Sequence, residues 1–286
     1  MNSSLRFLVL TLVLPLLLGA CAGTPAPSWT PLPAPTTPAT ATPAPKPAAV
    51  YTPTPQPEID TPGWFDNAIL YEIFVRSFYD SDGDGTGDLA GVTAQLDYLE
   101  ELGVNAIWLM PIHPSPSYHG YDVTDYFEIN PDYGALDDAY ALIDAAHEQG
   151  IHIIMDLVVN HMADDHPIFQ DAWGNPDSGY ADWFLWTNED HTAYQAFGGF
   201  KDMPKLNHEN PEVVAYVLDI ARFWMDLDGD GTYDGVDGFR ADVAKEVPLS
   251  TWQPLRAEMR ALNPESFLLG EVWDGNAQNL TKWYAA

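Results

Sequence analysis

Short apolar segments and longer amphipathic segments alternate along the chain from residue 64 onward. Apolar runs of this length are typical of buried strands, and amphipathic runs that stop at glycine are typical of helices. Regular alternation of the two predicts a parallel sheet, either doubly wound or a (β/α) barrel. The predicted strands are 68–78, 105–111, 151–161, 236–242 and 266–273, and the predicted helices are 89–102, 135–149, 211–226 and 250–262.

Residues 162–208 interrupt this rhythm, because they are rich in Trp, Gly, Asn and Asp and show no clear period. We therefore expect an irregular insertion after the third strand. No glycine-rich phosphate-binding loop follows the first strand, which argues against a dinucleotide-binding fold. Residues 58–286 are enough for one sizeable hydrophobic core.

The first twenty residues have the features of an export signal. Arg6 is their only charge, and the apolar stretch after it is too short for a membrane span and ends in Leu-Gly-Ala. We expect residues 1–20 to be a signal peptide with a bacterial lipobox, and Cys21 to be the lipidated residue that anchors the protein in the bacterial cell envelope. The alternative is an ordinary signal peptide and a secreted protein. Cys21 is the only cysteine, so the chain can form no internal disulfide.

Residues 21–57 consist mostly of Pro, Thr and Ala, a composition that predicts a stiff, extended linker. The linker contains no acidic residue, so all 42 Asp and Glu residues lie beyond it, and the formal net charge of the chain is −31. A strongly acidic surface repels phosphate backbones. Nucleic acid is therefore not an expected partner.

Polar residues follow every predicted strand, and the carboxyl ends of barrel strands are where active sites are built. They are Asp80 after the first strand, residues 113–122 after the second, Asn160 and His161 after the third, Asp242 after the fourth and Glu271 after the fifth. Asp242 and Glu271 close consecutive strands, so their carboxylates can face each other. Glycoside hydrolysis needs such a pair.

Arg240 lies two residues before Asp242 and therefore on the same face of the strand. A fixed cation there is expected to keep Asp242 ionised and aimed, as a nucleophile requires. The alternative is an internal Arg–Asp pair, with Glu271 a solvated strand end.

Three segments resemble conserved stretches of the α-amylase family of glycoside hydrolases, in the same order: DLVVNH (156–161), GFRADVAKE (238–246) and GEVW (270–273). The resemblance spans residues 64–286 and implies a (β/α)8 TIM-type barrel, of which about the first five β/α units are present. It also implies hydrolysis of α-glucosidic bonds, mainly α-1,4, in starch-like glucans or maltooligosaccharides, with retained configuration.

The resemblance also implies roles for single residues. Asp242 would be the nucleophile, Glu271 the acid/base and Arg240 the partner of the nucleophile. The residues that would bind the sugar are His119, Tyr121, Asp122, His161 and Lys245.

Two loops, DSDGDGTGD (80–88) and DLDGDGTYD (226–234), alternate carboxylates with glycine turns, a pattern suited to Ca²⁺. The first is similar to a calcium loop in several family members, and we expect its ion to be structural. The second binds another ion or forms an Asx-rich turn. The expected ligands are Asp80, Asp82, Asp84, Thr86 and Asp88 in the first loop and Asp226, Asp228, Asp230, Thr232 and Asp234 in the second. A further family calcium site at Asn160 is in doubt, because Glu246 stands where many α-amylases have histidine.

The segment MPKLN (203–207) is similar to the neopullulanase branch, near oligo-1,6-glucosidase. Tyr118 stands where exo-acting relatives tend to carry an acidic residue, so we expect an open cleft and internal cleavage. The insertion's aromatic side chains, including Trp173 and Trp183, can stack on sugars or form the insertion's own core.

Two other functions are less consistent with the sequence. A catalytically silent glucan-binding protein would lack Asp242 or Glu271, and both are present. A calcium-dependent adhesion repeat would need many tandem copies of the aspartate loop. Because five of the eight strands of a barrel are recognisable, we expect these residues alone to hydrolyse α-glucans negligibly and to be poorly soluble. The alternative is a short form that a partner chain completes.

Overall fold

Five parallel strands pair in the order in which they occur in the chain, in a computed structural model that describes residues 62–273, 280 and 283. The strands are β1 (Leu70–Ile73), β2 (Ala106–Leu109), β3 (His152–Leu157), β4 (Gly238–Ala241) and β5 (Phe267–Gly270). Each neighbouring pair is joined by a connection that contains at least one helix, so the parallel sheet and the insertion after the third strand are confirmed.

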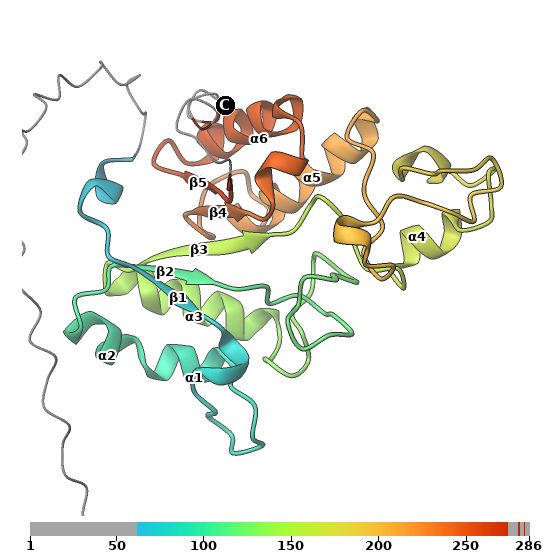
Figure 1. Cartoon of the computed structure of the whole chain (residues 1–286). Coiled ribbons are helices and arrows are strands. Elements are labelled where there is room, and N and C mark those ends of the chain that lie inside the picture. Colours follow the sequence, from blue (N-terminus) through green and yellow to red (C-terminus); the bar gives the residue numbers. More distant parts are fainter. Residues whose placement is uncertain (1–61, 274–279, 281–282, 284–286) are drawn as a thin grey trace, which may run out of the picture. The chain divides into compact units, whose positions relative to one another are not determined.

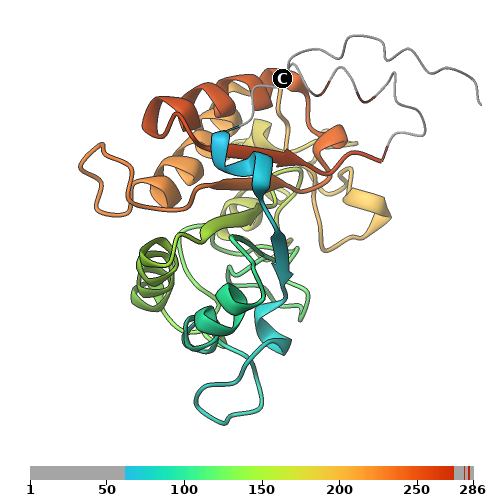
Figure 2. The ribbon, with the colours of Figure 1, turned by 90° about the vertical axis from the view of Figure 1, so that its left-hand side faces the viewer.

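The helices flank the sheet, while the insertion projects to one side of it (Figure 1). In Figure 2, β1 runs nearly vertically whereas the red strands near the carboxyl end run across the view, in keeping with the twist of a sheet. The helices are α1 (Leu89–Ala94), α2 (Leu96–Glu101), α3 (Leu136–Glu148), α4 (Pro167–Ala172), α5 (Pro211–Met225) and α6 (Leu249–Leu262). The short 3₁₀ turns are η1 (Gly63–Asn67), η2 (Val75–Ser77), η3 (Ala181–Trp183), η4 (Phe197–Gly199) and η5 (Ala244–Glu246).

The two faces of the sheet carry different kinds of side chain, because successive side chains of a strand point to opposite sides. One row of paired residues is apolar and includes the buried Leu109, Met155 and Phe239. The opposite row includes Glu72, which is exposed, and Trp108, which is half-buried. Farther along this second face, Asp156 pairs in register with Arg240. The apolar face carries the core, and the second face is therefore free to carry polar chemistry.

A buried polar cluster joins the amino ends of β3 and β4. The carboxylate of Asp237 accepts hydrogen bonds from the Ile153 amide (2.7 Å), His147 Nε2 (2.9 Å) and His152 Nδ1 (2.5 Å). Trp64 of η1 stacks on the ring of His152 at 4.1 Å. Burial alone would raise the pKa of Asp237, but the hydrogen bonds from the two histidines outweigh it and hold that pKa well below its usual range.

Several boundaries differ from the sequence-based expectation: the third strand ends at Leu157 rather than at residue 161, and the fifth at Gly270 rather than at residue 273. The first strand ends at Ile73 rather than at residue 78, because the chain turns into η2 there. The helix predicted at 89–102 is divided at Gln95, whose backbone leaves helical geometry (φ −106°, ψ 7°). Apolar residues continue beyond Ile73 and on both sides of Gln95, so the sequence pattern alone does not reveal either break.

The insertion has its own small core, built around Phe169 of α4. The rings of Trp173, Phe184 and Trp186 lie 4.9–5.7 Å from that of Phe169. Antiparallel bridges tie the segment 203–207 to this core and to His161, which follows the third strand. These aromatic side chains therefore hold the insertion together.

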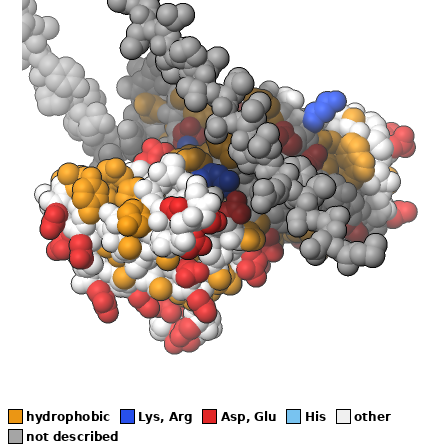
Figure 3. All heavy atoms as spheres, turned by 90° about the horizontal axis from the view of Figure 1, so that it is seen from below, with side chains coloured by type: hydrophobic (Ala, Val, Ile, Leu, Met, Phe, Trp, Pro, Cys, Tyr) orange, Lys and Arg blue, Asp and Glu red, His pale blue; other side chains and the backbone are white. Residues whose placement is uncertain are grey.

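The residues predicted to be the signal peptide, Cys21 and the predicted linker lie outside the described residues. Within residues 62–273, no helix has both the length and the apolar character that a membrane crossing requires. Acidic side chains are spread over the face in Figure 3, among few basic ones, in keeping with the charge of −31.

Candidate active site

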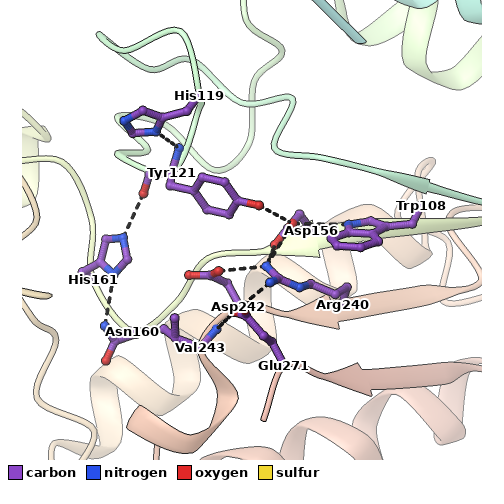
Figure 4. Close-up of polar contacts among 10 residues, drawn as sticks. All are labelled: Trp108, His119, Tyr121, Asp156, Asn160, His161, Arg240, Asp242, Val243 and Glu271. Carbon is purple, nitrogen blue, oxygen red and sulfur yellow. Dashed lines mark hydrogen bonds and ion pairs between the residues drawn. The ribbon is translucent and has the colours of Figure 1, made fainter. Parts of the chain in front are cut away.

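One guanidinium group, that of Arg240, holds three carboxylates at the carboxyl ends of β3, β4 and β5 (Figure 4). Arg240 Nη1 donates to Asp156 Oδ1 at 2.9 Å and to Asp242 Oδ1 at 2.8 Å. Arg240 Nη2 lies 2.7 Å from Glu271 Oε2. The two predicted catalytic carboxylates therefore share one cation.

Strand register explains this convergence. Asp242 and Glu271 each come one residue after a strand end, and the strands are parallel neighbours, so both side chains emerge at the same edge. The backbone continues the ladder there, because Asp242 N donates to Leu157 O and Glu271 N to Ala241 O. Arg240 and Asp242 are two residues apart and lie on one face, as predicted.

Asp156 was not predicted as a site residue. It is fully buried and accepts hydrogen bonds from Arg240, from Trp108 Nε1 (3.3 Å) and from Tyr121 Oη (3.3 Å). Arg240 also lies over the Trp108 ring, 5.0 Å from its centroid. The signal that could have found Asp156 is strand parity, because it opens the segment DLVVNH and faces Arg240 in register.

Burial governs the charge state of the nucleophile candidate. It raises the pKa of Asp242 to about 6, a rise that Arg240 reduces and that the nearby Glu271 adds to. Burial likewise raises the pKa of Asp156 to about 7, although Arg240 opposes it. Arg240 thus favours the ionised form of Asp242, as expected, although burial outweighs it, and Asp242 still ionises at neutral pH.

The residue after Asp242 has an unusual backbone. Val243 is left-handed (φ 39°, ψ 43°) and almost fully buried, and its amide donates to Glu271 Oε2 at 2.9 Å. A β-branched residue rarely adopts this conformation, which costs roughly 1–3 kcal/mol. Sequence reasoning gave no sign of this contact.

Three predicted sugar-binding residues form a chain beside the carboxylates. His161 Nε2 donates to the Tyr121 carbonyl (2.9 Å), and His161 Nδ1 accepts from Asn160 Nδ2 (3.0 Å). The Tyr121 amide lies 3.1 Å from His119 Nδ1. Burial lowers the pKa of His161 to about 4, so the ring is neutral and both nitrogens have fixed roles.

These residues surround an open cavity of about 480 Å³. Its lining includes His119, Tyr121, His161, Arg240, Asp242 and Glu271. The insertion adds Phe197, which stacks on His161 with ring centroids 5.1 Å apart, and the exposed Phe200. A cavity with two carboxylates and several aromatic faces suits a sugar ligand.

Two predicted sugar-binding residues do not line the cavity. The buried carboxylate of Asp122 accepts hydrogen bonds from the hydroxyls of Ser115 and Ser117. Lys245 Nζ lies over the ring of Trp273, 4.3 Å from its centroid, and Trp273 does line the cavity. Asp122 thus supports the loop that carries His119, and Lys245 supports Trp273.

The aspartate loops gather part of each predicted ligand set. Oxygens of Asp80, Asp82 and Asp88 can lie within 4.8 Å of one another, as can those of Asp226, Asp228 and Asp230. Asp84 and Asp234 are outside these groups: Asp84 accepts from the Thr86 amide and Asp234 from the Leu227 amide. Carboxylate oxygens are the ligands that Ca²⁺ prefers, and each group would supply three of about six to eight.

The doubtful calcium site at Asn160 has a different neighbour. Glu246, at the position where the family often has histidine, accepts a hydrogen bond from Lys205 Nζ at 3.1 Å. The ammonium group of Lys205, a residue of the insertion, is therefore paired with the carboxylate of Glu246 in η5.

Comparison with known proteins gives a consistent result. A family model described as the catalytic domain of alpha amylase matches residues 72–286. Alpha-amylase 3 of Dictyoglomus thermophilum is 43% identical over 238 residues, which cover 77% of this chain and 46% of that protein. Neopullulanase 2 of Thermoactinomyces vulgaris is 40% identical over 240 residues, 74% of this chain and 40% of that protein.

A solved structure, the alpha-amylase from H. orenii, matches with a TM-score of 0.65 and 43% identity and covers 73% of this chain and 48% of that one. The chain therefore spans less than half the length of these relatives.

Proposed function

Because this chain belongs to the α-amylase family of glycoside hydrolases, we propose that it hydrolyses α-glucosidic bonds, mainly α-1,4, in starch-like glucans or maltooligosaccharides, with net retention. The observation that carries the proposal is the contact of both Asp242 and Glu271 with the guanidinium of Arg240, at the wall of an open cavity. Two carboxylates that contact the same guanidinium group lie close together, as the double displacement of a retaining enzyme requires.

In the first step, a carboxylate oxygen of Asp242 attacks the anomeric carbon. Arg240 holds Oδ1, which leaves Oδ2 to form the glycosyl ester. As that bond forms, the bond to the glycosidic oxygen breaks, and Glu271 gives its proton to the departing oxygen. In the second step, Glu271 takes a proton from water, the water oxygen bonds to the anomeric carbon, and Asp242 is released.

The neutral His161 and the Tyr121 ring lie along the cavity wall beside this pair. They supply a hydrogen-bonding ring and a flat face that can hold the reacting sugar. Hydrolysis inside a glucan chain, rather than at its end, is supported by Tyr118, whose side chain is exposed and carries no charge. Maltoheptaose should then yield intermediate products before glucose.

Covalent trapping tests the proposal with small reagents. A 5-fluoro-α-glucosyl fluoride forms the ester without acid assistance and releases it slowly, so intact-mass spectrometry should detect a glycosylated protein. Asp242→Asn should show no added mass, because an amide cannot form the ester. Glu271→Gln should still be labelled, because fluoride departs without a proton. Because five strands alone are expected to be nearly inactive, the trapping is done in a protein in which three further strands complete the barrel. There, labelling of Asp242→Asn, or no labelling of the unaltered protein, would overturn the assignment.

Structural calcium is part of the same proposal. Asp80, Asp82 and Asp88 would hold one ion and Asp226, Asp228 and Asp230 a second. Neither group lines the cavity, so an ion there would stabilise its loop and take no part in the reaction.

We also propose that the protein is held at the cell envelope by a lipid on Cys21, with residues 22–57 as a spacer. The support is the sequence of the first 57 residues, which lie outside the described part.

A further inference from the structure

The left-handed Val243 directs a backbone amide at the acid/base candidate. Two donors converge on one oxygen, Glu271 Oε2: the Val243 amide at 2.9 Å and Arg240 Nη2 at 2.7 Å. With a right-handed or extended backbone, the Val243 amide would point elsewhere, because rotation about φ and ψ redirects the neighbouring peptide groups. The unusual conformation and the contact are therefore one feature.

The surrounding turn fixes this conformation. The Val243 carbonyl accepts from the Glu246 amide at 2.8 Å, and the next carbonyl, of Ala244, accepts from Trp252 Nε1 at 2.9 Å. Trp252 is buried on α6, so the packing of a helix holds the turn in place. A strained residue persists only where its surroundings determine it in this way.

We propose that Val243 is a positioning residue for Glu271, an inference that rests on the proposed function. Its amide and Arg240 engage Oε2, so the transferable proton sits on Oε1, the oxygen left to meet the glycosidic oxygen. When the Oε1–H bond breaks, the proton passes to the departing oxygen and the electron pair stays on Glu271. The two donors already face the carboxylate on which this charge develops, which is the preorganisation that lowers a barrier.

The test removes the amide hydrogen without changing the side chain. Val243 is replaced by its α-hydroxy acid analogue, so that an ester oxygen takes the place of N–H. Two substrates are compared: phenyl α-maltoside, whose leaving group needs a proton, and α-maltosyl fluoride, whose leaving group does not. We expect kcat/KM to fall roughly 10- to 100-fold on the phenyl substrate, since misplacing a catalytic group costs up to about 10²-fold. On the fluoride we expect little change.

A matched control lies in the same turn. The amide of Val247, also a buried valine, donates to the Ala244 carbonyl at 3.3 Å and does not touch Glu271. The same replacement at Val247 should leave the ratio of the two rates unchanged. Val243→Gly keeps the amide and accepts φ > 0 without strain, so it should also keep the ratio.

The outcomes separate this inference from the proposed function. Equal losses on both substrates, or no loss, after replacement of the Val243 amide would overturn the positioning role while the unaltered protein remains a hydrolase. If the replacement at Val247 also changes the ratio of the two rates, the effect belongs to the turn rather than to the contact with Glu271. Inactivity of an unaltered protein with a complete barrel on both substrates would instead refute the proposed function.

Discussion

Asp237→Asn is expected to destabilise the protein most strongly in mildly acidic solution. Asp237 is 4% exposed and accepts three hydrogen bonds, two at one oxygen and one at the other. An amide can accept on one side only, so at least one donor among Ile153, His147 and His152 would face an NH₂ group. A buried donor left without a partner costs about 1–3 kcal/mol, and breaking a buried charged pair costs about 3–5 kcal/mol.

A loss of about 3 kcal/mol is therefore reasonable. For a domain of this size, each kcal/mol lowers Tm by roughly 2–4 °C, which gives a decrease of roughly 6–12 °C. The exposed Asp144 is the matched control, since it also bears a charge near His147. Asp144→Asn should change the stability by less than about 0.5 kcal/mol.

The pH dependence has a definite sign. The pKa of Asp237 is lowered in the folded protein, so its contribution is present above about pH 3.9, the unfolded value, and is lost as pH falls through the folded pKa. The hydrogen bond to Asp237 raises the pKa of His147, so its contribution is complete below about pH 6.5 and is lost as pH rises through the folded pKa. Both act together between about pH 4 and pH 6.5.

Thermal melts followed by circular dichroism at pH 5.5 and pH 8.5 measure this effect. The difference in Tm between the unaltered protein and Asp237→Asn should be larger at pH 5.5, because the ion pair with His147 is then complete. A difference that is equal at both pH values, or larger at pH 8.5, would refute the argument from charge. A variant as stable as the unaltered protein would refute the argument from hydrogen bonding.

Calcium and the lipid anchor give two further tests. Chelation should lower Tm, because a ligand that binds only the folded state stabilises it. Asp82→Ala should remove the part of that shift that comes from the first loop, whereas Asp84→Ala, outside the converging group, should retain more of it. A melt that does not respond to the chelator would mean that the loops are turns. The full chain expressed in a bacterium should incorporate radiolabelled palmitate and Cys21→Ala should not, and labelling that survives the substitution would exclude Cys21 as the lipidated residue.

Most of the fold could be predicted from the sequence, because strand and helix periods are properties of the local pattern. The helix expected at 211–226 is observed as α5 (Pro211–Met225), with Asn210 as its N-cap. The helical break at Gln95 could not be predicted, because the apolar spacing of Leu89, Val92, Leu96 and Leu99 runs through it. Packing, rather than pattern, decides such a boundary.

The site was predictable where its residues follow strand ends and less so where contacts cross between elements. Asp242 and Glu271 could be paired because parallel strands end at one edge. Asp156 was overlooked because its importance depends on register with Arg240. Val243 could not be found at all, since valine gives no sequence signal of a left-handed backbone.

Strand β4 has Asp237 before its first residue and Asp242 after its last, at opposite ends of the sheet. At about 3.3 Å per residue, the two carboxylates are separated by roughly 16 Å. Substitutions that far apart, with no shared partner, change free energies independently to within about 0.5 kcal/mol. The amino ends of the strands are therefore the place to engineer tolerance of heat or pH, since changes there leave the geometry of the carboxylates around Arg240 intact.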